Sequence, residues 1–186
     1  MRERKSKQKR LPHKVYLVIC EGETEKTYVE SLRRAYRRPV TIKTKVSGNS
    51  INRRLVEQYV RELGVDSDAD YEIFYIYDAD VECVANKLLT LPGNTILTNP
   101  CLELWYALHV IDHNRSVSSE EAVKILEKSH TVWNGYLKGR LTPEQNRLLM
   151  DNCSVAMKRA ARLHWPGNPS SNMEKFINAL GNGEKR

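Results

Sequence analysis

The sequence is poor in the features that mark secreted and membrane proteins. It holds only four cysteines in 186 residues, and no two of them form a C-x-x-C pair. We therefore expect reduced, mostly buried thiols and predict no zinc site. The first apolar run, Val15 to Cys20, is too short for the core of a signal peptide or for a membrane span. The expected location is the cytosol.

Internal repeats, low-complexity tracts and a P-loop are also missing from the sequence. The absence of a P-loop removes the commonest phosphate-binding motif of nucleotide-hydrolysing proteins. What is present is 40% apolar residues, enough for a real core in a chain of 186 residues. A chain of this length fits one domain, or a core with a helical appendage.

Positive charge is in excess, with a net charge of +7 at pH 7 and a pI near 9.2. Such a surplus suggests a polyanionic partner, although a solvated surface explains it equally well. Part of it lies in residues 1–14, which we interpret as a basic N-terminal arm. Helix-dipole stabilisation and a solvated helix face are the alternatives for the remaining basic clusters. The candidate nucleic-acid-binding residues are Lys14, Arg33, Arg34, Arg37, Arg38, Lys158 and Arg162.

Strand and helix patterns alternate through the first half of the chain. Val15 to Cys20 and Ile73 to Tyr77 are continuous apolar runs, typical of strands buried on both faces. Val40 to Val46 alternates apolar and polar residues, which predicts an edge strand, and Thr95 to Thr98 is a fourth, short strand. Helical patterns separate these strands. The order predicts an α/β fold with a mainly parallel sheet of about four strands and right-handed crossovers.

Beyond His113 the pattern is helical, and three capping-box signatures occur there: Ser118-x-x-Glu121, Thr142-Pro143-x-Gln145 and Ser171-x-x-Glu174. They predict helices over residues 119–128, 143–163 and 172–180. Asn99-Pro100 predicts another helix start, with Asn at the cap and Pro at the first position. We therefore divide the chain into a basic arm (1–14), an α/β core (15–112) and a helical C-terminal extension packed on the core (113–186).

Acidic residues follow both continuous apolar strands. Glu21 comes directly after the first, and Asp78 and Asp80 come after the other. If the edge strand and the later strands lie on opposite sides of Val15 to Cys20, the two continuous strands are neighbours, about 4.8 Å apart. Their carboxylates then converge and repel one another unless a cation neutralises them. Oxygen ligands of this kind suit Mg²⁺ or Mn²⁺, which can activate water and polarise a phosphoryl oxygen.

Four sequence blocks resemble known proteins. Glu-Gly after one strand and Asp-x-Asp after another are similar to the Toprim domain of primases, topoisomerases and OLD-type nucleases. The full set of blocks is Glu21-Gly22-x-Thr24-Glu25-x-x-Tyr28, Asp78-x-Asp80, Asn99-Pro100-Cys101-x-Glu103-x-Trp105-x-x-x-His109 and Asn168-Pro169-Ser170-x-Asn172. Together these blocks resemble the RloB-like family of small Toprim proteins from bacterial defence and restriction-associated loci.

This resemblance implies a Toprim-like Rossmannoid core and a site built on Glu21, Asp78 and Asp80. Glu21 matches the catalytic glutamate, the two aspartates match metal ligands, and Glu103 matches a further acidic position that completes the metal site. Ala79 stands where a basic residue is expected, which leaves a phosphate-contacting side chain in doubt. The supporting positions are Gly22, Thr24, Glu25, Asn99, His109 and Asn168.

Less specific interpretations exist for several of these residues. Glu25 and Glu103 each stand in the first turn of a predicted helix, where an acid favours the helix dipole. His109 lies six residues beyond Glu103, about 9 Å along a helix axis, and we expect it in the core rather than in the same ligand shell.

The function that we expect is Mg²⁺-dependent (or Mn²⁺-dependent) hydrolysis of phosphodiester bonds in anti-phage defence, with RNA such as tRNA slightly favoured over DNA. The expected partners are nucleic acid and an ATPase or another protein of a defence system. The first alternative is a non-catalytic module that binds nucleic acid or a partner protein. Phosphoryl transfer on a nucleotide ranks last, because the chain is short for a polymerising enzyme.

Overall fold

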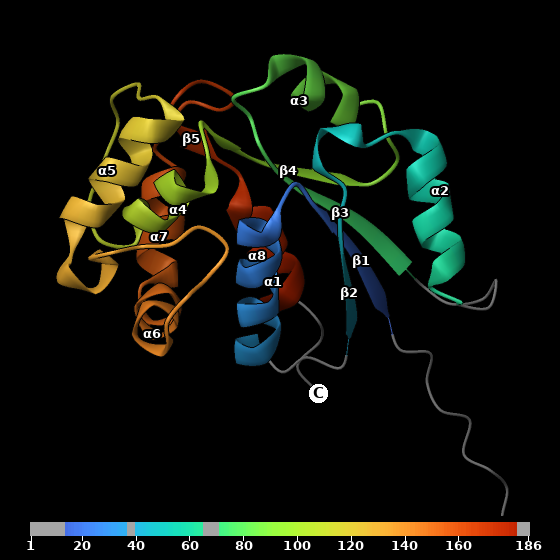
Figure 1. Ribbon diagram of the computed structural model, residues 1–186, viewed down its shortest axis with the longest axis horizontal. Coiled ribbons are helices and arrows are strands. Elements are labelled where there is room, and N and C mark those ends of the chain that lie inside the picture. Colours follow the sequence, from blue (N-terminus) through green and yellow to red (C-terminus); the bar gives the residue numbers. More distant parts are fainter. Residues whose placement is uncertain (1–13, 37–39, 65–70, 182–186) are drawn as a thin grey trace, which may run out of the picture.

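The computed structural model describes residues 14–36, 40–64 and 71–181 and has an α/β architecture, with a five-stranded sheet between two layers of helices (Figure 1). The strands lie in the order β2-β1-β3-β4-β5. All pairs are parallel except β4 with β5, which is antiparallel. Their bounds are β1 Val15–Cys20, β2 Thr41–Val46, β3 Tyr71–Asp78, β4 Asn94–Asn99 and β5 Ser170–Ser171.

The continuous apolar runs form the centre of this sheet, as the sequence predicts. All six residues of β1 are buried, and β1 pairs with β2 on one side and with β3 on the other. The alternating strand β2 lies at the edge of the sheet, which confirms the predicted position. The two strands that carry Glu21 and Asp78 at their ends are therefore direct neighbours.

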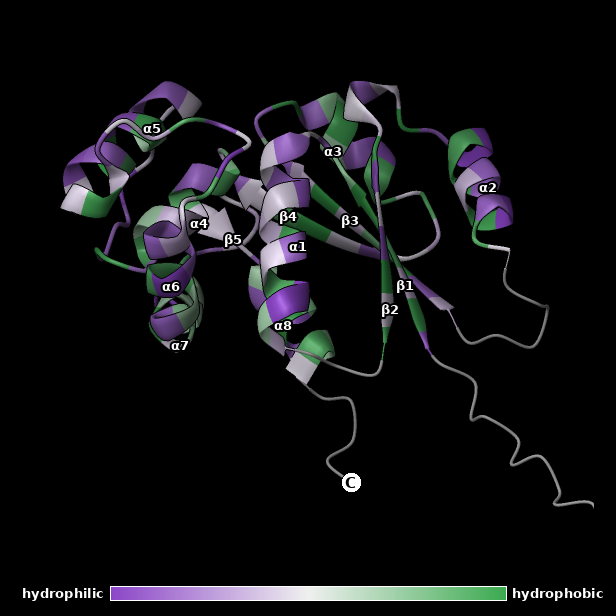
Figure 2. Cartoon of the chain, turned by 60° about the horizontal axis from the view of Figure 1, so that its bottom comes forward, coloured by the Kyte–Doolittle hydropathy of each residue, from purple (hydrophilic) through white to green (hydrophobic). Residues whose placement is uncertain are grey.

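Helices cover both faces of the sheet, so that side chains of alternating orientation find apolar partners on each side. On one face α1 and α8 pack against the strands, with the rings of Phe74 and Phe176 5.0 Å apart. On the other face α2 and α3 cover Leu17 and Ile19. Figure 2 shows that the central strands are largely hydrophobic and that the helices carry both hydrophobic and hydrophilic residues. The helix bounds are α1 Glu23–Tyr36, α2 Arg53–Glu62, α3 Glu82–Leu88, α4 Leu102–Leu108, α5 Ser119–Ser129, α6 Pro143–Asp151, α7 Cys153–Ala160 and α8 Met173–Gly181, with short 3₁₀ turns at Gly48–Ser50 and Thr131–Trp133.

Helix α4 is the centre of a helical group that stands beside the β5 edge of the sheet (Figure 1). Every residue of α4 is buried, and Tyr106 stacks on Trp133 with ring centroids 5.6 Å apart. The last helix, α8, leaves this group and packs on the sheet beside β4. The division of the chain at residues 112 and 113 stays a prediction.

Four local expectations differ from the structure. Asn99 does not cap a helix, because its backbone pairs with Ser170 and keeps it in β4, and α4 begins after Cys101. That pairing adds β5, so the sheet has five strands rather than four. The expected helix over 143–163 is two helices, since the chain turns at Asn152, where φ is −100°. The predicted capping box at Ser171 is incomplete. Ser171 Oγ accepts from the N–H of Met173, but the Glu174 side chain does not accept from the Ser171 N–H in return. The boxes at Ser118 and Thr142 form as predicted.

The cysteines are free and mostly buried, as the sequence predicts. All four cysteines are free, and Cys20, Cys101 and Cys153 are buried, while Cys83 is exposed. Within 14–36, 40–64 and 71–181, no helix has both the length and the apolar character needed to cross a membrane.

Candidate functional site

Glu21 and Asp78 meet at the carboxyl end of the two central strands. Strand β1 ends at Cys20, and the backbone N–H of Glu21 still donates to the carbonyl of Ile76 in β3 at 3.1 Å. This pairing brings the Glu21 side chain to the end of β3, where its Oε2 accepts from the N–H of Asp78 at 3.0 Å. Burial raises the pKa of Glu21, although that hydrogen bond opposes the shift.

Glu25 is part of the same group and is more than a helix-start acid. Its side chain is 5% exposed, and Oε2 accepts from the N–H of Gly22 at 2.8 Å. A Cβ on Gly22 would lie 3.3 Å from that oxygen, which explains a residue without a side chain in this turn. Burial raises the pKa of Glu25 to about 6, and the carboxylates of Glu21 and Glu103 add to the shift. The first-turn position alone did not reveal this burial.

Asp78 links the sheet to α4. Its Oδ1 accepts from the N–H of Leu102 at the start of that helix, at 2.9 Å. Burial raises the pKa of Asp78 to about 9, and the neighbouring carboxylates, with Glu25 and Glu21 foremost, raise it further. A carboxyl with this pKa holds its proton at neutral pH unless a cation replaces it.

Asp80 lies at the outer side of the group and is exposed. Its Oδ2 accepts from the hydroxyl of Ser119, at the start of α5, at 2.9 Å. Asp80 therefore connects the end of β3 to the helical half of the chain.

Glu103 contacts two residues that the sequence patterns did not indicate. Its side chain is 2% exposed, and its Oε1 accepts from the Tyr136 hydroxyl at 3.1 Å and lies 3.5 Å from Lys138 Nζ. Burial lowers the pKa of Lys138, but the neighbouring Glu103, Cys101 and Asp78 together outweigh it, so the pKa of Lys138 is raised. Lys138 also lowers the pKa of Glu21, which places its charge near both carboxylates.

The loop that carries Lys138 is fastened to α1. The N–H of Gly139 donates to Thr24 Oγ1 at 3.1 Å, and Thr27 Oγ1 donates to the Gly139 carbonyl at 2.9 Å. Gly139 has φ +77°, a conformation that favours glycine. Thr24, expected as a supporting residue, thus holds this loop over the carboxylates. No periodic pattern could predict the contact, because 115 residues separate its partners.

The chemistry of this donor set fits a hard divalent cation. Glu21, Asp78, Asp80 and Glu103 supply only oxygen ligands, and their mutual repulsion is the kind that a cation relieves. Each carboxylate is hydrogen-bonded to a protein donor. In the described part of the chain, no three acidic, histidine or cysteine side chains form a ready ligand group. Each of these hydrogen bonds occupies one oxygen of its carboxylate, so a cation can bind the other oxygen or replace the protein donor.

The expected nucleic-acid residues are not gathered at this site. Lys14 precedes β1, at the opposite end of the sheet from Glu21, and it pairs with Glu72. Arg162 lies 3.4 Å from an oxygen of Asp112. Arg33 and Arg34 are exposed in the last turn of α1, and Lys158 is exposed on α7. Arg37 and Arg38 lie outside the described residues.

The remaining supporting residues act within the fold. His109 is 1% exposed, and its Nδ1 lies 2.8 Å from the carbonyl oxygen of Trp105. The Asn168 side chain binds the backbone of Val117: its Oδ1 accepts from the N–H at 3.1 Å and its Nδ2 donates to the carbonyl at 2.7 Å. The Asn99 side-chain amide donates to the Pro166 carbonyl at 3.1 Å. The Asn168 contacts connect the segment before β5 to the loop before α5, and the Asn99 contact connects that segment to the end of β4.

A comparison with protein families gives one match that spans most of the chain. The model of the family described as "RloB-like protein" matches residues 16–180. This range runs from β1 to the last turn of α8 and includes all the carboxylates above. Neither a curated protein nor a solved structure shows significant similarity to the chain.

Proposed function

The chain belongs to the RloB-like family, and we propose that it is a metal-dependent nuclease of the Toprim type that hydrolyses phosphodiester bonds in nucleic acid. One observation carries the proposal. Carboxylates from two neighbouring strand ends and from the first turn of α4 gather at one edge of the sheet, and the pKa of Asp78 is raised to about 9 there. Open α/β sheets bind their ligands at this edge.

The roles follow from the position of each carboxylate. Asp78, Asp80 and Glu103 would hold Mg²⁺ or Mn²⁺. When bound, such a cation supplies charge stabilisation to a phosphoryl oxygen and lowers the pKa of a bound water. Glu21 serves as general base or acid, since burial raises its pKa toward the range useful for proton transfer. Glu25 fixes the Glu21-Gly22 turn through the N–H of Gly22.

Lys138 provides the positive charge that the sequence lacks between Asp78 and Asp80, where Ala79 stands. In the structure it neutralises Glu103 and is 59% exposed, so its ammonium group can also reach an incoming phosphate. We assign it to contact the phosphate next to the bond that is cleaved.

The net charge of +7 supports a nucleic-acid substrate, because lysine and arginine contacts with phosphates release counterions. We favour structured RNA such as tRNA over DNA, because the chain has no motif that reads a duplex. A cytoplasmic role in anti-phage defence, alongside an ATPase or another defence protein, is part of the proposal.

One observation favours a second candidate, a non-catalytic module that binds nucleic acid or a partner protein. The carboxylates already have protein donors, and among residues 14–36, 40–64 and 71–181 no three ligands stand ready for a metal. In that case the acidic group would stabilise the junction between the sheet and α4.

Cleavage of labelled RNA and DNA panels in the presence of Mg²⁺ or Mn²⁺ separates the two candidates. We expect the wild type to cleave and Glu21→Gln, Asp78→Asn and Asp80→Asn to lose at least about a hundredfold in rate. Asp151→Asn, an exposed aspartate at the end of α6, is the matched control and should cleave normally. An inactive wild type, or equal cleavage by the Asp78 and Asp80 variants, would reject the nuclease and leave the binding module.

A further inference from the structure

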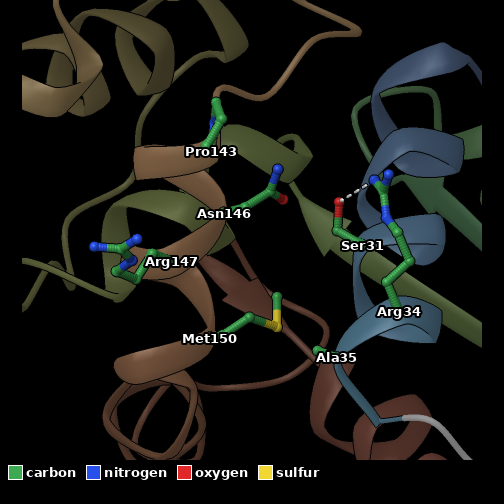
Figure 3. Close-up of a pocket in the computed structure, with 7 residues that line it drawn as sticks. All are labelled: Ser31, Arg34, Ala35, Pro143, Asn146, Arg147 and Met150. Carbon is green, nitrogen blue, oxygen red and sulfur yellow. Dashed lines mark hydrogen bonds between the residues drawn. The ribbon is translucent and has the colours of Figure 1, made fainter.

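A cavity of about 330 Å³ opens between α1 and α6 (Figure 3), and none of the site's carboxylates lines it. Ser31, Arg34 and Ala35 line it from α1, and Pro143, Asn146, Arg147 and Met150 line it from α6. Figure 3 shows Asn146 facing Ser31 and Arg34 across the opening, with Met150 and Ala35 below them. None of the lining residues is acidic.

The Asn146 amide carries an unmet hydrogen-bonding capacity. Its Oδ1 is buried and accepts no hydrogen bond from any described residue. The Ser31 hydroxyl across the cavity does not supply a donor, because it donates to the Thr27 carbonyl at 2.9 Å. Arg34 donates one N–H to Ser31 Oγ at 3.4 Å, and its other N–H groups can donate to a ligand. A buried carbonyl oxygen without a donor is unfavourable, so a ligand with an N–H or O–H group gains by supplying one.

The other walls suit a flat, mostly apolar group with an anion attached. Met150, Ala35 and Pro143 present apolar surface, and the Arg34 guanidinium stands at the rim. A nucleotide combines these properties. Each of the four bases carries an N–H donor on its Watson–Crick edge, its ring is apolar on both faces, and its phosphate pairs with arginine.

We propose that this cavity holds one unpaired nucleotide of the bound nucleic acid, whose base donates to Asn146 Oδ1 while Arg34 contacts its phosphate. The inference rests on the nucleic-acid part of the proposed function and does not require cleavage. In a duplex the Watson–Crick edge is already paired, so the cavity selects single-stranded segments or loops.

Helix α1 sets the distance between this cavity and the carboxylates. Ser31 follows Glu25 by six residues on the same helix, about 9 Å along its axis. This length corresponds to about three stacked nucleotides at 3.4 Å per base. Thr27, which helps to hold the Lys138 loop, lies between the two places on α1. Because this loop covers Thr24 and Thr27, a strand that reaches both places runs over the outside of the loop.

The test is binding of short fluorescent RNA in EDTA, where no metal-dependent cleavage occurs, with single 2-aminopurine substitutions at successive positions. We expect single strands to bind more tightly than the same strand annealed to its complement. One substituted position should brighten on binding as its base leaves the stack. Asn146→Leu should abolish that brightening and weaken binding at least about fivefold, and Arg34→Gln should weaken it by a similar factor.

Asn86→Leu on α3 and Arg54→Gln on α2 are matched controls on the opposite face of the sheet, and both residues are exposed. They should bind and brighten like the wild type, and thermal melts of all variants verify folding. Equal binding by Asn146→Leu, Arg34→Gln and the controls, or tighter binding of duplex than of single strand, would overturn the proposal. If the wild type binds in this way but never cleaves, the cavity assignment stands and the nuclease assignment fails.

Discussion

At the scale of single residues, Glu103 is the buried carboxylate whose contacts matter most for the site. The side chain is nearly fully buried, and it keeps a hydroxyl donor in Tyr136 and a cation in Lys138. A buried carboxylate that loses such partners keeps its desolvation cost without compensation. Lys138 is therefore important for stability as well as for the proposed reaction.

Replacing Lys138 by methionine tests this stabilisation. We expect Lys138→Met to lower the free energy of unfolding by about 1 kcal/mol at pH 8, a modest value because the lysine side chain is largely exposed. Urea denaturation measures the change. Lys87→Met on the exposed side of α3 is the control. Adding Glu103→Gln to Lys138→Met should recover most of the loss, since the neutral side chain no longer needs a cation. Equal stability of Lys138→Met and the control would contradict the assigned ion pair.

His109 makes the stability of the fold depend on pH in the acidic range. Burial lowers its pKa to about 4, and the charge of Arg159, whose guanidinium caps α4 at the Leu108 carbonyl, adds to the shift. The hydrogen bond to the Trp105 carbonyl partly opposes it. The folded protein therefore keeps this histidine neutral, with Nδ1–H as the donor to that carbonyl.

A histidine with a lowered pKa stabilises the fold above its unfolded pKa near 6.5, and this contribution is lost as the pH falls toward 4. We expect His109→Asn, which can still donate to the Trp105 carbonyl, to lose less stability than the wild type between pH 6.5 and 4, by up to about 3 kcal/mol. Chemical denaturation at several pH values measures the difference. The exposed His164→Asn should follow the wild-type pH profile. A His109→Asn curve parallel to the wild type would show that this histidine is not held neutral.

At the scale of elements, β4 depends on a side chain from a distant segment. Asn172 follows β5, and its Oδ1 accepts from the N–H of Leu97 at 2.7 Å while its Nδ2 donates to the Thr95 carbonyl at 3.1 Å. The Asn172 side-chain amide therefore continues the hydrogen bonding along β4 beyond the two residues that pair with β5. Because α4 follows directly on β4, this contact supports the helix that carries Glu103.

We expect Asn172→Ala to lower the free energy of unfolding by about 2 kcal/mol, since it leaves the buried N–H of Leu97 and the partly buried carbonyl of Thr95 without partners. Urea denaturation of the variant beside Asn178→Ala, an exposed position on α8, provides the comparison. A loss no greater than that of the control would mean that the amide does not support β4.

The elements that sequence patterns predicted correctly are those with strong local signals. Continuous apolar runs identified β1 and β3, and alternation identified the edge strand β2. Strand β5 was missed because two serines carry no apolar pattern. The start of α4 was misplaced because pairing with β5, a tertiary contact, outweighs the local capping preference of Asn99.

At the scale of the whole molecule, the strand order decides which residues meet. Parallel strands separated by helices place the ends of β1 and β3 together, so the proximity of Glu21 and Asp78 could be predicted from the order of the elements. Lys138 and the cavity between α1 and α6 could not, because they depend on how the helical half folds back over α1.

The central claim is that the carboxylates at this edge of the sheet bind a divalent cation together. The direct measurement is titration of the protein with Mn²⁺, followed by the electron paramagnetic resonance signal of the free ion. We expect the wild type to remove Mn²⁺ saturably and Asp78→Asn and Asp80→Asn to bind at least about tenfold more weakly, while Asp151→Asn binds as the wild type does. A wild-type protein that leaves the free Mn²⁺ signal unchanged, or aspartate variants that bind the ion as tightly as the control, would contradict the account.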